Sequence, residues 1–182
     1  MLNLYMVILG CNVPNRYIEQ HDVFFSIGAD LLNLKQSMYD FWPEAGDKLH
    51  IDSYRIVSRV GDYVIKIVLK ENESKSDDLN LYFLNLGGYK PHDMEEYHYK
   101  QLVVAKSIED AVALATEHVF FKHHNEPHVD NKYGIDVDDI YLVSDILPNI
   151  IRNQYSLQIM KANAHHKEDD LAIGYIKLSE WQ

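Results

Sequence analysis

The chain has 182 residues, enough for one sizeable domain or two small ones, and its 47% hydrophobic and 25% charged residues are typical of a soluble globular protein. A formal net charge of −11 disfavours binding to nucleic-acid backbones and to anionic membrane surfaces, because both require a basic face. The single cysteine, Cys11, excludes an intrachain disulfide. It also favours a reducing compartment, so we expect a cytoplasmic protein.

The first 70 residues predict the order β-β-α-β-β. Short apolar runs bounded by Gly and Pro are typical of strands, and an apolar spacing of three to four residues after a possible N-cap, Asp30, indicates a helix that ends near Pro43. The predicted strands cover residues 5–9, 18–27, 50–58 and 63–69, and the predicted helix covers 31–41. The charged stretch 71–78 contains no apolar residue and is interpreted as a linker.

The rest of the chain predicts a similar order. Strands are expected at 81–86 and 99–105, and a helix is expected after Ser107, which forms a variant capping box with Asp110. Residues 140–146 and 155–160 predict the late strands. A final strand at 171–178 has no counterpart in the first half.

Both halves also share a residue pattern at a constant offset of 77 positions. Leu, Tyr, Leu, Gly, Pro, Glu and His recur in the same spacing, and the two copies are Leu4 to His21 and Leu81 to His98. The pattern predicts an internal duplication with a first repeat unit at 1–70, a linker at 71–79 and a second repeat unit at 80–182, together forming one compact domain. The expected fold is α+β, with a mixed or antiparallel sheet covered by two helices about a pseudo-twofold axis.

Each copy ends in a carboxylate and an imidazole two residues apart, Glu19 with His21 and Glu96 with His98. Residues two apart on a strand point to the same face. Such a pair can hold a divalent metal, act as a general acid and base, or form a structural hydrogen bond.

A second pattern of His and Asp occurs once in each half, as His50 with Asp52 and His128 with Asp130. If each pattern lies near the Glu/His pair of its own unit, imidazoles and carboxylates together form a ligand set suited to Zn, Mn or Fe. The alternative is that Asp52 and Asp130 only turn the chain before the third strand.

Four longer motifs resemble the bacterial "domain of unknown function 1543" family. They are Arg16–Phe25, Phe41–Ala45, Asn85–Pro91 and Asp136–Tyr141, and the resemblance extends over nearly the whole chain. Members of that family carry the domain once or twice, which agrees with the predicted duplication. The resemblance implies a shared fold and no particular activity, substrate or cofactor, and no catalytic residue is carried over.

The leading hypothesis is therefore a bacterial protein that binds a small ligand or a divalent metal between its two repeats. Glu19, His21, Glu96 and His98 would line this site, and Arg16 and Lys90 at its rim would accept an anionic group. A hydrolase or lyase that uses Glu and His as base and acid is an enzymatic version of the same site. The alternative is a protein-interaction module, for which the 13 tyrosines would suit an interface.

Overall fold

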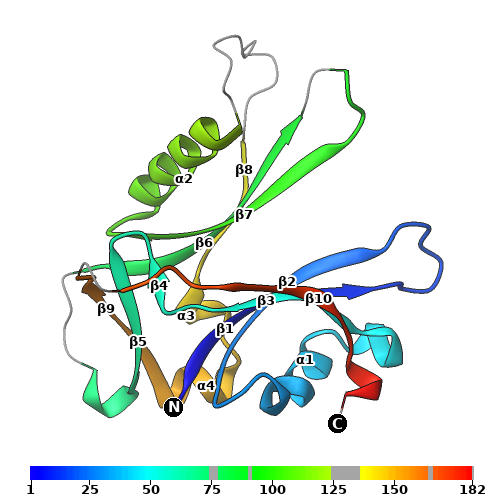
Figure 1. Ribbon diagram of the computed structural model, residues 1–182, viewed down its shortest axis with the longest axis horizontal. Coiled ribbons are helices and arrows are strands. Elements are labelled where there is room, and N and C mark those ends of the chain that lie inside the picture. Colours follow the sequence, from blue (N-terminus) through cyan, green and yellow to red (C-terminus); the bar gives the residue numbers. More distant parts are fainter. Residues whose placement is uncertain (74–77, 90–91, 124–135, 164–165, 182) are drawn as a thin grey trace. The chain divides into compact units, whose positions relative to one another are not determined.

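The computed structural model describes residues 1–73, 78–89, 92–123, 136–163 and 166–181, and of residues 118–123 and 136 it describes the backbone only. The chain divides into two compact units. Unit 1 consists of Met1–Ser74 and Leu147–Gln182, and unit 2 consists of Lys75–Ile146. Both are α+β, and every strand pairing among the described residues is antiparallel (Figure 1).

Unit 1 contains a four-stranded sheet in the order β10-β3-β1-β2 and a three-stranded sheet in the order β4-β5-β9. The strands are β1 Asn3–Cys11, β2 Gln20–Gly28, β3 His50–Ile56, β4 Arg59–Val60, β5 Tyr63–Leu69, β9 Tyr155–Lys161 and β10 Leu171–Lys177. The helices are η1 Leu32–Leu34, α1 Lys35–Phe41, η2 Pro43–Lys48, η3 Lys70–Asn72, α4 Asn149–Gln154 and η4 Leu178–Glu180.

The core of unit 1 lies on one face of the four-stranded sheet. Because strand side chains alternate between faces, the odd-numbered residues of β1 point to this core, and Val7, Leu9 and Cys11 have no exposed surface. Leu34 and Met38 pack against them from η1 and α1. The even-numbered face of β1 carries the apolar residues Leu4, Met6 and Ile8, and polar side chains of β2 and β3 gather on it at the Gly10 end.

Unit 2 contains a three-stranded sheet in the order β7-β6-β8, with β6 Asn80–Tyr89, β7 Glu96–Ala105 and β8 Asp136–Leu142. Helix α2, Ile108–His123, packs on this sheet through Ala111 and Ala115, which have no exposed surface. The hydroxyl of Ser107 accepts a hydrogen bond from the backbone N–H of Asp110, so the predicted cap of this helix is present.

Several segments differ from the sequence-based expectation. Residues 143–146, expected to continue a strand, form the short helix α3, Val143–Ile146. Leu147–Gln182, expected in the second repeat unit, groups with unit 1. The reason is long-range pairing, because β9 pairs with β5 and β10 pairs with β3, and a local pattern does not specify the partner of a strand.

Within the part of the chain that the structure describes, no helix is both long enough and apolar enough to cross a bilayer.

Candidate functional site

The candidate site of unit 1 lies around Gly10, near the end of the central strand β1. Gly10 pairs with His21 on β2 and with His50 on β3, so the three residues form one row across the sheet. Residues directly opposite one another in a sheet share a face, so both imidazoles flank the glycine on the even-numbered face of β1. Glu19 precedes His21 by two positions, just before β2 begins.

Asp52 reaches the same place because β3 contains a bulge. Leu9 pairs with Ile51 and Ile8 pairs with Ser53, which leaves Asp52 as the extra residue between them. A bulge redirects the side chain of the extra residue.

The four side chains meet through four N···O separations. His21 Nε2 lies 3.6 Å from Glu19 Oε2 and 3.2 Å from Asp52 Oδ2. His50 Nε2 lies 3.2 Å from Glu19 Oε1 and 3.5 Å from Asp52 Oδ1. Neighbouring ligands on one metal ion, each bonded at about 2.0–2.2 Å, are about 3.0–3.5 Å apart. The four separations in unit 1 have this size pair by pair, whereas among the described residues three ligand atoms that all lie within 4.8 Å of one another occur in unit 2.

His50 is the least exposed member of the cluster. Its side chain is 4% exposed, and its Nδ1 lies 3.0 Å from the carbonyl oxygen of Lys48. A carbonyl only accepts, so Nδ1 carries the proton and the lone pair of the neutral ring is on Nε2. Nε2 is buried and makes no hydrogen bond to the protein, although Glu19 Oε1 lies 3.2 Å away. A nitrogen lone pair that faces two carboxylates is repelled by them unless a proton or a metal ion lies between the groups.

A second atom of the cluster is also without a hydrogen bond. Asp52 Oδ2 is buried and has no donor, and His21 Nε2 approaches it at 3.2 Å without forming a hydrogen bond. Buried polar atoms are normally satisfied. Both unsatisfied atoms, His50 Nε2 and Asp52 Oδ2, carry lone pairs and can donate them to a cation.

The glycine itself makes room for this convergence. A Cβ atom at position 10 would lie 2.3 Å from His50 Nε2 and 2.8 Å from Asp52 Oδ2. Neither separation is sterically possible, so only glycine fits at the centre of the row.

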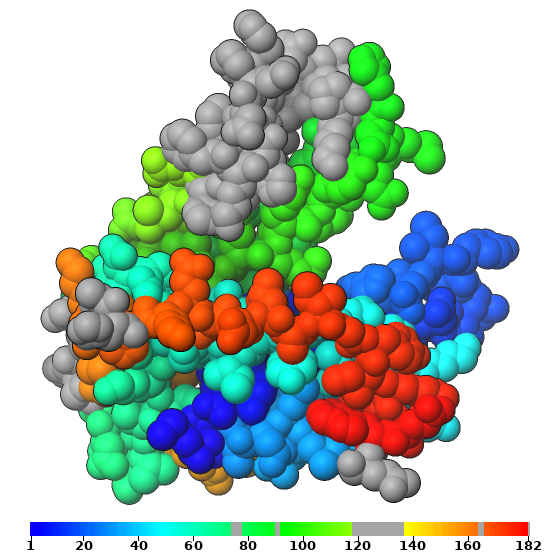
Figure 2. Space-filling model, in the orientation of Figure 1, coloured from blue at the N-terminus to red at the C-terminus, as the bar shows by residue number. Residues whose placement is uncertain are grey.

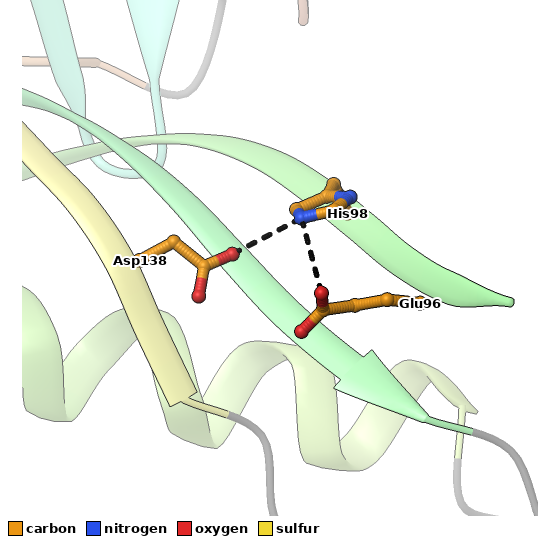
Figure 3. Close-up of side chains that lie close together, drawn as sticks. All are labelled: Glu96, His98 and Asp138. Carbon is orange, nitrogen blue, oxygen red and sulfur yellow. Dashed lines mark ion pairs between the residues drawn. The ribbon is translucent and has the colours of Figure 1, made fainter. Parts of the chain in front are cut away.

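Unit 2 contains a related cluster around Gly87. Gly87 pairs with His98 on β7 and with Asp136 on β8, and a bulge after Asn85 makes Asp138 the extra residue. Ligand atoms of Glu96, His98 and Asp138 all lie within 4.8 Å of one another (Figure 3). His98 Nε2 lies 3.3 Å from Asp138 Oδ2 and 4.0 Å from Glu96 Oε2.

The two clusters differ by one buried side chain, His50, because the matched residues Glu19, His21 and Asp52 are 36%, 43% and 32% exposed, about as much as their counterparts in unit 2. In unit 2 the side chains are 38%, 41% and 31% exposed for Glu96, His98 and Asp138. The position opposite Gly87 that corresponds to His50 is occupied by Asp136. The described side chains of this cluster therefore supply one imidazole, and those of unit 1 supply two.

The glutamate of each cluster has a neighbour on the central strand. Asn12 Nδ2 donates to Glu19 Oε1 at 3.2 Å, and Tyr89, 77 positions after Asn12, is paired with Glu96. The negative charge of Glu96 and a hydrogen bond to it raise the pKa of Tyr89, so this hydroxyl remains a donor at neutral pH. Glu19 is thus hydrogen-bonded by the residue that follows β1, and Glu96 by the last residue of β6.

Cys11 follows Gly10 but points to the opposite face. It has no exposed surface, and its Sγ donates to the carbonyl oxygen of Ala45 at 3.7 Å. Burial raises the pKa of this thiol above its ordinary value of 9.0, with Lys48 lowering it and Glu19 raising it to a smaller extent. The group therefore stays a neutral thiol, as expected for a small core residue.

The structure brings together most of the residues that the sequence singled out. Glu19, His21, His50 and Asp52 meet in unit 1, and Glu96 and His98 meet in unit 2. Arg16 is exposed in the loop between β1 and β2, where its backbone N–H donates to the carbonyl oxygen of Val13. Lys90, His128 and Asp130 lie outside the described residues. A single site shared between the two repeats stays a prediction.

One member, Asp138, was missed by the sequence analysis. Asp136-Val137-Asp138 has the same polar-apolar-acidic order as His50-Ile51-Asp52, and both start the strand beside the central glycine strand. This similarity could have identified Asp138 as a candidate, but an acidic run at the start of a strand is also typical of a solvent-exposed sheet edge. Only the strand pairing separates the two interpretations.

Comparisons with known proteins agree with the fold. Residues 16–67 match a family model described as "Domain of Unknown Function (DUF1543)". The chain is similar in structure to a crystal structure of a protein Il1583 from Idiomarina loihiensis, with a TM-score of 0.66 and 23% sequence identity over 100% of both chains. At this identity the likeness shows the fold alone. A comparison with curated proteins gave no significant match.

Proposed function

We propose that the chain is a metal-binding protein whose unit 1 holds a divalent transition-metal ion with Glu19, His21, His50 and Asp52. Two imidazole nitrogens and two carboxylates suit Zn, Mn or Fe(II). The observation that carries the proposal is the buried, unsatisfied Nε2 of His50, which faces Glu19 and Asp52.

The orientation of His50 supports the same function. A metal-bound histidine normally donates its other ring N–H to a carbonyl or carboxylate, which fixes the tautomer and the ring direction. His50 makes this contact with the Lys48 carbonyl. The imidazole is thus preorganised with its free nitrogen toward the cluster.

Glu96, His98 and Asp138 form a second, weaker site in this proposal. They offer one imidazole and two carboxylates, one ligand fewer than unit 1, and no buried imidazole like that of His50. The matching positions of the glycine, the glutamate, the histidine and the bulge support descent of the two units from one β-β-α-β element.

Metal content and metal affinity test the proposal directly. Purified protein is loaded with Zn²⁺, Mn²⁺ or Fe²⁺ under anaerobic conditions and dialysed, and bound metal is measured by elemental analysis and by titration calorimetry. We expect one tightly bound ion per chain. Glu19→Gln and His21→Ala should each weaken its binding by at least about tenfold, because each removes a ligand.

Asp22→Asn is the matched control for these variants. Asp22 lies beside His21 on β2, and its exposed carboxylate accepts a hydrogen bond from the Val23 backbone N–H, so the substitution should leave metal binding unchanged. Protein that takes up none of the three ions at micromolar concentration contradicts the proposal. Unfolding of His21→Ala in metal-free protein would instead favour a structural role for the Glu/His pair.

A further inference from the structure

Unit 1 contains an open pocket of about 890 Å³ beside the proposed metal ligands. Glu19 and His50 line its inner side, and Lys48, Tyr175, Lys177 and Ser179 line the rest, together with Asn12 and Asp47. Pockets of 300–1,000 Å³ are of the size that holds small molecules. The pocket therefore gives a small molecule direct access to the Glu19 and His50 side of the cluster.

Strand β10 creates this pocket. It lies beside β3 (Figure 1), and the register of this pair sets Lys177 opposite His50. The Tyr175 ring lies 4.5 Å from the His50 ring at 33°, so it covers one face of the imidazole. The strand lies at the surface of unit 1 (Figure 2, orange to red). Among the described residues of unit 2, no strand is added outside β8, so this pocket distinguishes unit 1.

The charges of the pocket depend on whether the metal is bound. Glu19, Asp52 and Asp47 bring three negative charges to the pocket and its cluster, against two positive charges from Lys48 and Lys177. Glu180 pairs with Lys177, and this hydrogen bond raises the pKa of Lys177 above 10.5, so the ammonium group stays charged. A divalent ion adds two positive charges to the cluster, so that Lys48, and Lys177 beside its partner Glu180, are no longer outweighed by Glu19, Asp52 and Asp47.

We propose that this pocket binds a small molecule through an oxyanion group, a carboxylate or a phosphate, which contacts the metal ion and is neutralised by Lys48 and Lys177. The inference rests on the proposed metal site. Four protein ligands leave an ion such as Mn²⁺ or Fe²⁺ with open positions, and the pocket opens toward the ligands Glu19 and His50. Because the metal-free carboxylates repel an anion, the ion binds first and the anion second.

The test uses malonate and inorganic phosphate as probes of the two oxyanion types. Each probe is titrated by calorimetry into the full chain, with and without Mn²⁺. Each is also added to Co²⁺-loaded protein, because the visible spectrum of Co²⁺ changes when a new oxygen ligand binds. We expect at least one probe to bind the metal-loaded protein at least about tenfold more tightly than the metal-free protein and to change the Co²⁺ spectrum. Which probe binds more tightly distinguishes a carboxylate ligand from a phosphate ligand.

Lysine variants test the residues. Lys48→Ala keeps the backbone carbonyl that orients His50, so it should weaken the anion by about tenfold and leave metal affinity unchanged, as should Lys177→Ala. Lys66→Ala, an exposed lysine of β5 outside the pocket, is the matched control and should change neither affinity.

The outcomes separate this inference from the proposed function. If the protein binds metal normally but neither probe binds, the pocket proposal alone is overturned. The same follows if metal-free protein binds the anion as tightly as metal-loaded protein does, or if both lysine variants bind it as tightly as the wild type. Absence of metal binding overturns the proposed function, and the pocket proposal falls with it.

Discussion

At the scale of single residues, Gly10 decides whether the candidate site exists. It separates His21 and His50 in one row of the sheet, and its missing side chain provides the space in which His50 and Asp52 approach. Gly87 has the same place between β7 and β8. The two glycines differ in what faces them, because the buried imidazole of His50 lies against Gly10 and the partly exposed carboxylate of Asp138 lies against Gly87.

Gly10→Ala is expected to displace His50 and to remove metal binding in unit 1. The added methyl group would meet the buried imidazole, which cannot move aside freely, so we expect a loss of about 1–3 kcal/mol in the free energy of unfolding. Both tryptophans, Trp42 and Trp181, belong to unit 1, so urea denaturation followed by tryptophan fluorescence reports on this unit.

Gly87→Ala is the matched comparison. Its methyl group would meet only the carboxylate of Asp138, whose side chain is 31% exposed and able to swing into solvent. We expect a stability loss below about 1 kcal/mol and metal binding in unit 1 unchanged. Wild-type metal affinity in Gly10→Ala would show that the cluster is not the metal site.

At the scale of elements, β10 joins a distant part of the chain to the site. Its side chains Leu171, Ile173 and Tyr175 are 65–83% exposed, so burial of its own residues does not explain its position. The strand is held at its two ends instead. Before β10, Asp169 accepts hydrogen bonds from the backbone N–H groups of Ser58 and Arg59 and from the Ser58 hydroxyl. After β10, Leu178 is fully buried in the core of unit 1.

Leu178→Ala is therefore expected to weaken unit 1 by about 2–4 kcal/mol, through lost burial and the cavity left in the core. Leu171→Ala, at the exposed start of β10, should change stability by less than about 0.5 kcal/mol. Urea denaturation followed by tryptophan fluorescence measures both. Similar losses in the two variants would mean that the end of β10 is not its anchor.

At the scale of the whole molecule, binding of the proposed metal ion should stabilise unit 1 more than unit 2. The tight site uses side chains of β2, β3 and the loop before β2, all in unit 1. A ligand that binds only the folded state stabilises it by about 2.7 kcal/mol at a free concentration of 100 times its Kd.

Zn²⁺ or Mn²⁺ should consequently slow hydrogen exchange of the backbone amides in β1, β2 and β3 at low concentration, and in β6, β7 and β8 only at higher concentration. EDTA should reverse both effects. Exchange measured by mass spectrometry on proteolytic peptides assigns each change to a unit. An equal change in both units at the same concentration would contradict the unequal affinities that we derive from ligand number and the burial of His50.

Local patterns in the sequence determined much of the architecture. Short apolar runs bounded by Gly and Pro identified β1, β2 and β5, and Ser107 with Asp110 identified the start of α2. The spacing of Glu19 and His21 placed both on one face of a strand, because that relation involves only neighbouring residues. Helix 31–41 was located correctly, but it begins as a 3₁₀ turn, in which Asp30 accepts a hydrogen bond from the Asn33 N–H.

Only the tertiary structure decided which of these elements meet. That β10 pairs with β3 and places Tyr175 against His50 depends on contacts between residues more than 100 positions apart, which no local period encodes. The same holds for Asp138, whose neighbour His98 is set by two strand pairings and a bulge. The sequence by itself identified Glu19, His21, His50, Asp52, Glu96 and His98 as candidate ligands and predicted that each Glu/His pair lies on one face of a strand. The long-range pairing of β3 with β1 and β10 buries His50. This burial leaves its Nε2 without a hydrogen bond and distinguishes the cluster of unit 1 from an ordinary group of polar surface side chains.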